Sequence, residues 1–418
     1  MTEKTNTPEL RFPEFREGWK EFILNDVSIK KSKKNKNNLY NETFTNSAEY
    51  GIVSQKEYFD KEISNKKNLN NYYIVEPNDF VYNPRISNLA PVGPINRNKL
   101  NRTGVMSPLY TVFSTKLSIK SFLEYYFKTS KWHRFMKLNG DSGARSDRFT
   151  IKQSLFIKMP IFLPSNQEQE KIGDFFSKLD RQIELEEQKL EKLEEQKKGY
   201  MQQIFSQELR FKDESENDYP EWKERKFSEL LSYSSNGVDK KINKNHDIAY
   251  MVNYMDVLKK TKLNTKNRDL LMKITATKVQ KEKNNLKKGD ILFTPSSETR
   301  EDIAKSTVVF EDLDNTVYSY HLIRLRPLDS NIFSLKYSNY LSEQNFISKQ
   351  FRRLAQGAQR YTLTKEYFEN IKLNLPHIKE QEKIGDFFSK LDEVINKQSQ
   401  KIDELKLRKQ GFLQKMFV

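Results

Sequence analysis

The thirteen-residue sequence EQEKIGDFFSKLD occurs twice in this 418-residue chain, at 168–180 and again, without a change, at 380–392. The prolines that precede the two copies, Pro164 and Pro376, are also separated by 212 positions. Self-similarity of this kind indicates an internally duplicated fold. The sequence therefore predicts two equivalent units, and it disfavours any fold that is built around a single central core.

Each copy begins a seam of apolar residues spaced alternately four and three positions apart, which is typical of helices that pair in a coiled coil. We predict two helices of roughly 40 residues, about 60 Å long, with Ser165 or Asn166 as the N-cap of the first. The residues predicted to pair the helices are Ile172, Phe176, Leu179, Ile183, Leu190 and Leu193 in the first helix, and Ile384, Phe388, Leu391, Ile395, Ile402 and Leu405 in the second.

Polar residues within the two seams indicate the direction of pairing. Parallel pairing in register would place Lys197 beside Lys409 in a desolvated stripe, which is unfavourable. Antiparallel pairing would set Glu186 near Lys409 and Lys197 near Gln398, which is electrostatically better. We therefore predict an antiparallel pair with this register. A single core-facing helix is the alternative for one short stripe, but two matched stripes with charged outer faces favour mutual pairing.

A second repeat involves the start of the chain. ELRF stands at 9–12 and again at 208–211, after the end of the first predicted helix, and each copy leads into a similar phrase, FPEF or YPEW. The second long helix ends with the chain, so the ELRF expected after it stands at the N-terminus instead. This order predicts a pseudo-twofold internal repeat with adjacent chain ends.

The segments between the helices correspond more weakly, as in NDFVYNP at 78–84 with GDILFTP at 289–295, and GARSDRFT at 143–150 with GAQRYT at 357–362. Short β-branched and aromatic runs predict strands in both segments. The stretches 123–137 and 335–353 each predict a helix. We therefore expect the α/β (α+β) class, with two similar mixed α/β domains separated by the two helices.

The predicted division of the chain follows from these patterns. Residues 1–164 form the first domain, 165–207 the central long helix, 208–376 the second domain and 377–418 the C-terminal long helix. The helices are identical where the domains have diverged. This contrast indicates that the helices meet the same partner twice, while each domain meets something different.

The charge of the chain indicates a polyanionic partner. The formal net charge is +16, and the excess of Lys and Arg lies in the two domains rather than in the helices. Cations that neutralise phosphates gain affinity from counterion release. An AT-rich coding sequence, which favours Lys and Asn, is the alternative, but it would spread the charge evenly. Two different basic domains on a rigid helical spacer fit a protein that reads two DNA half-sites at a fixed separation.

Composition also excludes several classes of site. The chain has no cysteine and four scattered histidines, which disfavours disulfides, thiolate sites and a metal cluster. It has neither an apolar run long enough to span a membrane nor a signal sequence, so we expect a cytoplasmic protein without a membrane partner. A G-x-x-x-x-G-K-[ST] phosphate loop is absent, as is the Asn/Asp-Pro-Pro-aromatic signature of amino-methyltransferases, so we expect no catalytic site.

The order of domain, long helix, domain, long helix, together with NDFVYNP/GDILFTP and QEQEKIGDFFSKLD, resembles the specificity (S) subunit of type I restriction-modification systems. The resemblance covers the whole chain. It implies a non-catalytic subunit with two target recognition domains, each reading one half of a bipartite site in double-stranded DNA. It also implies helices that set the spacing and dock two methyltransferase (modification) subunits, with restriction/translocase subunits added outside. S-adenosylmethionine, used for adenine methylation, and ATP and Mg²⁺, used for cleavage, are expected on those partners, so this chain should hold no cofactor.

Candidate DNA contacts follow from the chemistry of base recognition. Arg forks read guanine, Asn and Gln read adenine, and Lys mostly meets phosphate. A solvated surface position is the alternative for each candidate. The residues predicted to contact DNA are Lys56, Arg85, Arg97, Arg102, Arg145 and Arg148 in the first domain, and Asn253, Lys278, Arg300, Gln359 and Arg360 in the second.

A different class of function is compatible with the same organisation. A coiled-coil scaffold that joins two protein-binding domains would also need two long helices, and its basic charge would then be incidental. The two hypotheses differ in sequence-selective DNA binding, which only the first one requires.

Overall fold

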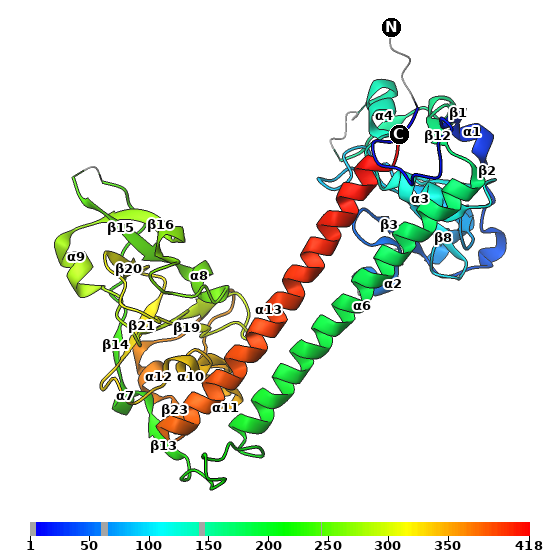
Figure 1. The fold of residues 1–418 in the computed structure, drawn as a ribbon. Coiled ribbons are helices and arrows are strands. Elements are labelled where there is room, and N and C mark those ends of the chain that lie inside the picture. Colours follow the sequence, from blue (N-terminus) through cyan, green and yellow to red (C-terminus); the bar gives the residue numbers. More distant parts are fainter. Residues whose placement is uncertain (1–5, 60–65, 142–146, 244) are drawn as a thin grey trace. The chain divides into compact units, whose positions relative to one another are not determined.

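The computed structural model describes residues 6–59, 66–141, 147–243 and 245–418 (Figure 1). Its contacts divide the chain into two compact units. Unit 1 comprises residues 1–187 and 400–418, and unit 2 comprises residues 188–399. Both boundaries fall inside the two long helices, so each unit holds one globular domain, the first part of one long helix and the last part of the other.

The domain of unit 1 is built around a four-stranded antiparallel sheet with the order β2-β9-β6-β7. Its central strand β6 is buried along its whole length, because the run Phe-Val-Tyr is apolar on both faces. These strands are β2 Ser28–Lys31, β6 Phe80–Tyr82, β7 Ile95–Arg97 and β9 Thr111–Thr115. The remaining strands form two-stranded pairs: β1 Lys20–Ile23 with β12 Pro160–Leu163, β3 Phe44–Ser47 with β4 Gly51–Ser54, β5 Tyr73–Val75 with β8 Gly104–Met106, and β10 Gly140–Asp141 with β11 Thr150–Ile151.

The domain of unit 2 repeats this plan. Its four-stranded sheet has the equivalent order β14-β21-β17-β19, and β13 pairs with β23 as β1 pairs with β12. It adds a three-stranded sheet of the order β16-β15-β20. The strands are β13 Lys223–Lys226, β14 Leu231–Ser234, β15 Asp247–Val252, β16 Met272–Ala276, β17 Ile291–Phe293, β18 Ser296–Ser297, β19 Ser306–Val308, β20 Thr316–Tyr318, β21 Ile323–Pro327, β22 Tyr361–Thr362 and β23 Lys372–Leu375. The predicted class of two similar mixed α/β domains is confirmed.

Short helices cover these sheets and differ from the prediction in one respect. Each stretch predicted as a single helix is broken into shorter pieces. In unit 1 the break follows α3, where Thr129 Oγ1 and the Trp132 indole donate to the carbonyls of Tyr126 and Phe127 and compete with a continued helix. The helices are α1 Leu24–Val27, α2 Gln55–Phe59, α3 Lys120–Phe127, α4 His133–Asn139 and α5 Gln153–Phe156 in unit 1, and α7 Phe227–Leu230, α8 Tyr254–Leu258, α9 Lys278–Lys283, α10 Leu335–Ser338, α11 Asn345–Leu354 and α12 Lys365–Asn370 in unit 2.

The two long helices are α6 Asn166–Phe205 and α13 Ile378–Lys415, as the heptad seams predict. Ser165 is the residue that caps α6, since its Oγ accepts a hydrogen bond from the backbone N–H of Glu168 at 3.3 Å. No helix in the described part of the chain is long and apolar enough to cross a membrane.

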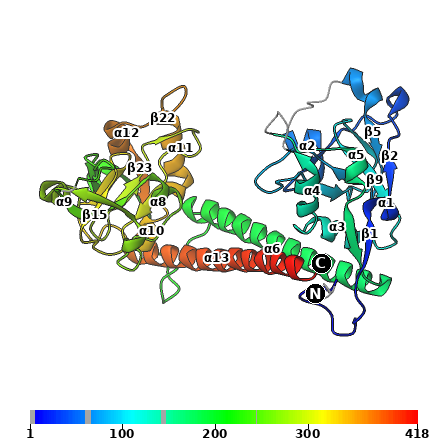
Figure 2. The ribbon, with the colours of Figure 1, turned by 90° about the horizontal axis from the view of Figure 1, so that it is seen from above.

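Within each unit the two helices run antiparallel (Figure 2). In unit 1 Phe175, near the start of α6, contacts Phe412, near the end of α13, with ring centroids 5.2 Å apart. In unit 2 Tyr200 and Phe387 make the equivalent contact at 5.1 Å. The predicted direction of pairing is therefore confirmed in both units.

The predicted register of the charged residues is wrong. Lys409 pairs with Asp180 rather than Glu186, and Lys197 pairs with Asp392 at 2.8 Å and with Glu343 at 3.2 Å. Glu186 instead meets Lys401 at 2.6 Å. The reason is packing, because the contacts of Phe175 with Phe412 and of Tyr200 with Phe387 set a different register. In that register Lys409 lies opposite the turn that contains Asp180.

The expected adjacency is confirmed in unit 1 for described residues near the two ends of the chain. The backbone N–H of Leu10 donates to the carbonyl oxygen of Lys415 at 2.8 Å. Phe417 is buried, with its ring centroid 5.3 Å from that of Phe122 and 6.2 Å from that of Trp19. The last turn of α13 and the residues after it thus complete the core of the first domain.

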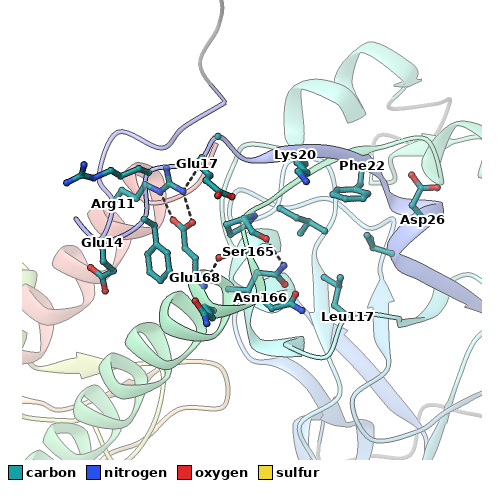
Figure 3. Close-up of a pocket in the computed structure, with 18 of the residues that line it drawn as sticks. Arg11, Glu14, Glu17, Lys20, Phe22, Asp26, Leu117, Ser165, Asn166 and Glu168 are labelled. Atoms are coloured by element: carbon teal, nitrogen blue, oxygen red, sulfur yellow. Dashed lines mark hydrogen bonds and ion pairs between the residues drawn. The ribbon is translucent and has the colours of Figure 1, made fainter.

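Each ELRF arginine clasps the start of a long helix. In the first clasp, Arg11 binds both carboxylate oxygens of Glu168 at 2.7 Å (Figure 3). The Trp19 indole lies 3.4 Å from the same carboxylate. In the second clasp, Arg210 binds Glu380 at 3.1 and 2.8 Å, and the Trp222 indole donates at 2.9 Å. Both glutamates are buried, at 1% and 0% exposure. The repeated ELRF and the repeated helix sequence are therefore two halves of one duplicated contact.

A glycine in each repeated helix sequence permits a close approach of the adjacent domain. A Cβ atom on Gly385 would lie 2.6 Å from the backbone nitrogen of Tyr337 in α10. A Cβ on Gly173 would lie 2.3 Å from Oγ of Ser121 in α3. The contact at Gly385 is with backbone, so a side chain there would push the domain away from the helix. The contact at Gly173 is with a serine hydroxyl, which can rotate aside.

Candidate nucleic-acid interface

In unit 2, three of the predicted DNA contacts gather at the two-stranded sheet β18–β22. The guanidinium of Arg300 lies 5.0 Å from the centre of the Tyr361 ring, and Arg360 Nε donates to Ser296 Oγ at 3.2 Å. Gln359 precedes Arg360 in the turn that leads into β22, and all three side chains are exposed. The structure therefore brings Arg300, Gln359 and Arg360 into one exposed basic group.

The turn before β22 depends on a glycine. Gly357 has φ +137°, and a Cβ at this position would lie 2.0 Å from the carbonyl oxygen of Arg360. A residue with a side chain would therefore force the turn open. Tyr254 supports the other strand, because its hydroxyl donates to the carbonyl oxygen of Ser296 at 3.0 Å, and burial raises the pKa of this phenol. The arginines are thus presented by a locally constrained backbone.

Unit 1 builds an equivalent group around Arg85 and Arg148. These two residues form a backbone bridge, and the N–H of Phe149 donates to the carbonyl oxygen of Pro84 at 2.7 Å. The same bond recurs in unit 2 from Leu363 to Pro295 at 2.9 Å. Arg85 is exposed and Arg148 is half-buried. This bond makes Phe149 equivalent to Leu363, so the bridged pair Arg85 and Arg148 corresponds to the pair Ser296 and Thr362. The two units therefore share the backbone arrangement but carry their arginines at neighbouring rather than identical positions.

Two other arginines, Arg97 and Arg102, form ion pairs with glutamates of their own domain. Arg97 binds Glu124, which is 4% exposed, with Nε at 2.8 Å, and it also donates to Asn78 Oδ1 at 2.8 Å. Arg102 forms a bidentate ion pair with Glu42, in which Nε and Nη2 each donate to one carboxylate oxygen at 2.8 Å. These positions favour a structural role for both residues rather than the predicted contact with DNA.

The remaining candidates are scattered. Asn253 caps α8, since its Oδ1 accepts a hydrogen bond from the Met255 N–H at 2.8 Å. Lys56 and Lys278 are exposed on α2 and α9, respectively. Arg145 lies outside the described residues. The sequence did not reveal the partner of Arg97, because Glu124 is brought close only by folding. The role of Asn253 has a local signal that the sequence prediction missed, since Asp256 stands three residues later and completes a capping box with it.

The residues predicted to pair the helices lie on the inner faces of α6 and α13 or where these helices meet the domains. Ile172 and Phe176 belong to the core of the first domain, and Ile384 and Phe388 to that of the second. Ile183 and Ile402 are buried as well. The other six are half-buried: Leu179, Leu190, Leu193, Leu391, Ile395 and Leu405. The seam therefore serves two purposes, because its first members anchor a domain and its later members join the helices.

A charged group joins helix and domain in unit 1. Asp180 pairs with Lys409 and accepts a hydrogen bond from the Tyr125 hydroxyl at 2.8 Å. Burial opposes the charge on Asp180, but Lys409 and Lys128 favour it, and the net effect lowers the pKa of this carboxyl below its usual value. The carboxylate thus stabilises the folded unit as long as it is ionised.

This shift predicts an acid-sensitive contribution to stability. Because the pKa of Asp180 is lower in the folded state, its ionised carboxylate adds to the free energy of unfolding. This contribution is fully present above the unfolded pKa of about 3.9 and is lost as the pH falls through the folded pKa. Between about pH 5 and pH 3, the wild-type chain should therefore lose more unfolding free energy than Asp180→Asn. Urea titrations at several pH values measure this. Asp174→Asn, on an exposed position of α6, is the control, and parallel pH profiles for wild type and Asp180→Asn would contradict the prediction.

The described part of the chain contains no group of three or more His, Asp or Glu side chains placed to hold a metal ion. The interface described above consists instead of exposed guanidinium and amide groups. Such groups are donors with fork geometry, suited to phosphate oxygens and to guanine or adenine edges.

Comparison with known proteins identifies the family. A model of the type I restriction modification DNA specificity domain matches the chain twice, over residues 16–195 and 219–407. The chain belongs to the type I restriction-modification DNA specificity family. The two matches fall on the two repeats found in the sequence, so each repeat is one copy of the specificity domain.

Two solved structures share the fold of this specificity protein. One is a chain from a study of complex assembly and conformational transition in the type I R-M system, with 13% sequence identity, a TM-score of 0.60, and coverage of 97% of this chain and 98% of that one. The other is the type I restriction-modification S subunit from M. genitalium, with 13% identity, a TM-score of 0.54, and 99% coverage of both chains. At this identity the likeness concerns the fold.

Proposed function

We propose that this specificity protein is the DNA sequence-recognition subunit of a type I restriction-modification complex, and that each domain reads one half of a bipartite target. The observation that carries the proposal is a duplicated scaffold with unlike exposed loops. The bridged backbone positions that carry Arg85 and Arg148 in unit 1 carry Ser296 and Thr362 in unit 2. In unit 2 the exposed side chains beside that pair are Arg300, Gln359 and Arg360. Different side chains on the same scaffold are what two different half-sites require.

The long helices would set the spacing and dock two methyltransferase subunits. Much of the repeated helix sequence is used within the chain, in the clasps and the close glycine contacts. Two charged residues remain on the outer face of each copy, namely Glu170 and Lys178 in α6, and Glu382 and Lys390 in α13. The aspartate between them is exposed as well, as Asp174 in α6 and as Asp386 in α13, where it pairs with Lys336 at 2.5 Å. All six side chains are exposed. An identical exposed face in two places suits two copies of one partner.

The chemistry would then reside in the partners. Methyltransferase subunits would supply S-adenosylmethionine for adenine methylation, and restriction/translocase subunits would supply ATP and Mg²⁺ chemistry for cleavage. The chain itself would be non-catalytic and would act in the cytoplasm, where the DNA is. This assignment rests on family membership and on the basic, exposed character of the interface.

Selection from a random duplex library tests the proposal. The full-length chain, assembled with its methyltransferase partner, should enrich one bipartite sequence with a constant gap. A coiled-coil scaffold that joins two protein-binding domains would enrich none, and that result would overturn the proposal. Methylation mapping in cells that carry the complete system gives the target and the gap independently.

Arg360 gives a sharper test of the second half-site. Arg360→Ala should relax selection at one base pair of that half-site by about 1–3 kcal/mol, because a lost bidentate Arg–guanine contact costs this much. Selection in the other half-site should be unchanged. Arg353→Ala, at an exposed arginine on α11, is the control. If Arg360→Ala weakened binding to all duplexes equally, Arg360 would be a phosphate contact instead.

A further inference from the structure

The loop between β6 and β7 of unit 1 has a tight turn, Ser87–Ala90, at its tip. We infer that this turn recognises an A·T base pair in the first half-site, and this inference rests on the proposed DNA-reading function. Asn88 would bind the adenine edge, and Leu89 would contact the thymine methyl group. The three following observations concern the geometry of the turn, the rigidity of its base and its basic surroundings.

The turn presents Asn88 and Leu89 at its tip. Ser87 and Ala90 exchange two backbone hydrogen bonds of 3.1 Å, and Ser87 Oγ accepts a further bond from the Ala90 N–H at 3.2 Å. Asn88 is exposed, and Leu89 is 70% exposed. The fold does not need Leu89, because its side chain leaves the core. A single exposed leucine is common on protein surfaces, so the inference also needs the next two observations.

The base of the loop is held by a buried amide network. Asn83 Nδ2 donates to the carbonyl oxygen of Asn46 at 2.8 Å, and Asn46 Nδ2 donates to that of Val81 at 2.7 Å. Asn96 Nδ2 also belongs to this network and donates to Asn46 Oδ1 at 2.7 Å. Gly93 has φ +81°, and a Cβ there would lie 2.1 Å from the carbonyl oxygen of Asn83. The tip is therefore carried on a preorganised base, which lowers the entropy lost on binding.

The flanks of the loop are basic and fixed to the candidate interface. Arg85 begins the loop and is bridged by its backbone to Arg148. The next residue, Ile86, donates its N–H to the carbonyl oxygen of Asp147 at 3.1 Å. Contacts of these arginines with phosphate or guanine would therefore bring the turn against the same duplex.

The chemistry of the tip matches one base pair. In the major groove adenine offers its N7 acceptor and N6 donor, which an asparagine amide can bind together, and thymine offers its C5-methyl group to an apolar side chain. The equivalent loop of unit 2, between β17 and β19, carries the exposed polar residues Glu298, Thr299 and Arg300 instead. That loop has no apolar tip, so the A·T preference should be confined to the first half-site.

Base analogues test the inference on the full chain assembled with its methyltransferase partner. Each thymine of the selected first half-site is replaced in turn by uracil, which lacks the methyl group. For the wild type, one replacement should weaken binding about fourfold, the value of one buried methyl group. In Leu89→Ala the same replacement should have no effect. Replacing the paired adenine by 7-deazaadenine should weaken wild-type binding and leave Asn88→Ala unaffected.

The outcomes separate the inference from the function on which it rests. If the wild type selects no sequence, the proposed function fails. If it selects a bipartite sequence but no thymine shows an effect of uracil that Leu89→Ala removes, the inference fails alone. Leu138→Ala, at a leucine of α4 that is 75% exposed, is the control for losing an exposed apolar side chain. A wild-type scan in which no thymine responds to uracil overturns the inference without any variant, so a folding defect in Leu89→Ala cannot hide that outcome.

Discussion

Arg210→Ala should lower the free energy of unfolding of unit 2 by about 3–5 kcal/mol, the usual cost of removing one partner of a buried ion pair. Glu380 is fully buried, and its two oxygens accept from Arg210 and from the Trp222 indole. Without Arg210 a carboxylate would remain in the core with one donor. Urea unfolding followed by circular dichroism measures the loss.

Two further variants make this result specific. Arg225→Ala breaks an exposed pair with Glu229 in the same domain and should cost less than about 1 kcal/mol. Adding Glu380→Gln to Arg210→Ala removes the stranded charge and should recover part of the stability. If Arg210→Ala cost no more than Arg225→Ala, the clasp would not be the buried anchor described above.

Gly385→Ala should destabilise unit 2 by about 1–3 kcal/mol, although glycine is normally the poorer residue inside a helix. The added methyl group would meet backbone atoms of α10, with Tyr337 N at 2.6 Å and Lys336 C at 2.8 Å. Backbone cannot rotate aside as a side chain can, so the domain would have to move away from the helix. The urea midpoint of unit 2 measures the effect.

The same helices contain matched controls. Gly199 in α6 and Gly411 in α13 occupy equivalent positions of the repeat, and a Cβ at either would meet nothing within 4 Å. Gly199→Ala and Gly411→Ala should therefore raise stability by up to about 1 kcal/mol, through helix propensity alone. If Gly385→Ala also raised the stability of unit 2, the domain would not be in close contact with the helix at this point.

The clasps and the glycine contacts revise the interpretation of the identical helices. The sequence suggested that the two copies are identical because they meet the same partner. Glu168, Gln169, Ile172, Gly173 and Phe176 are buried within unit 1, and their equivalents are buried within unit 2. Much of the identity therefore follows from two equal intramolecular junctions, and the outer charged face is what remains for a partner.

The candidate interface was predictable only in part. Arg85, Arg148, Arg300, Gln359 and Arg360 follow Gly- and Pro-marked turns, and this local signal placed them in exposed loops. Arg97 and Arg102 follow similar signals, yet Glu124 and Glu42 hold them, and these partners lie 27 and 60 residues away along the chain. Ion pairs over such distances leave no local pattern, so the sequence could not separate the two groups.

The duplicated plan was predictable from the sequence, as were the long helices, their antiparallel direction and the class of the domains. These features depend on periodicity and on repeated residues, which act locally or in matched copies. The register of Lys197 and Lys409 was not predictable in this way, nor were the breaks after α3 and α10 or the partner of each arginine. Those outcomes depend on which carboxylates and carbonyl groups folding brings within a few ångströms, and that distance is a property of the packed chain.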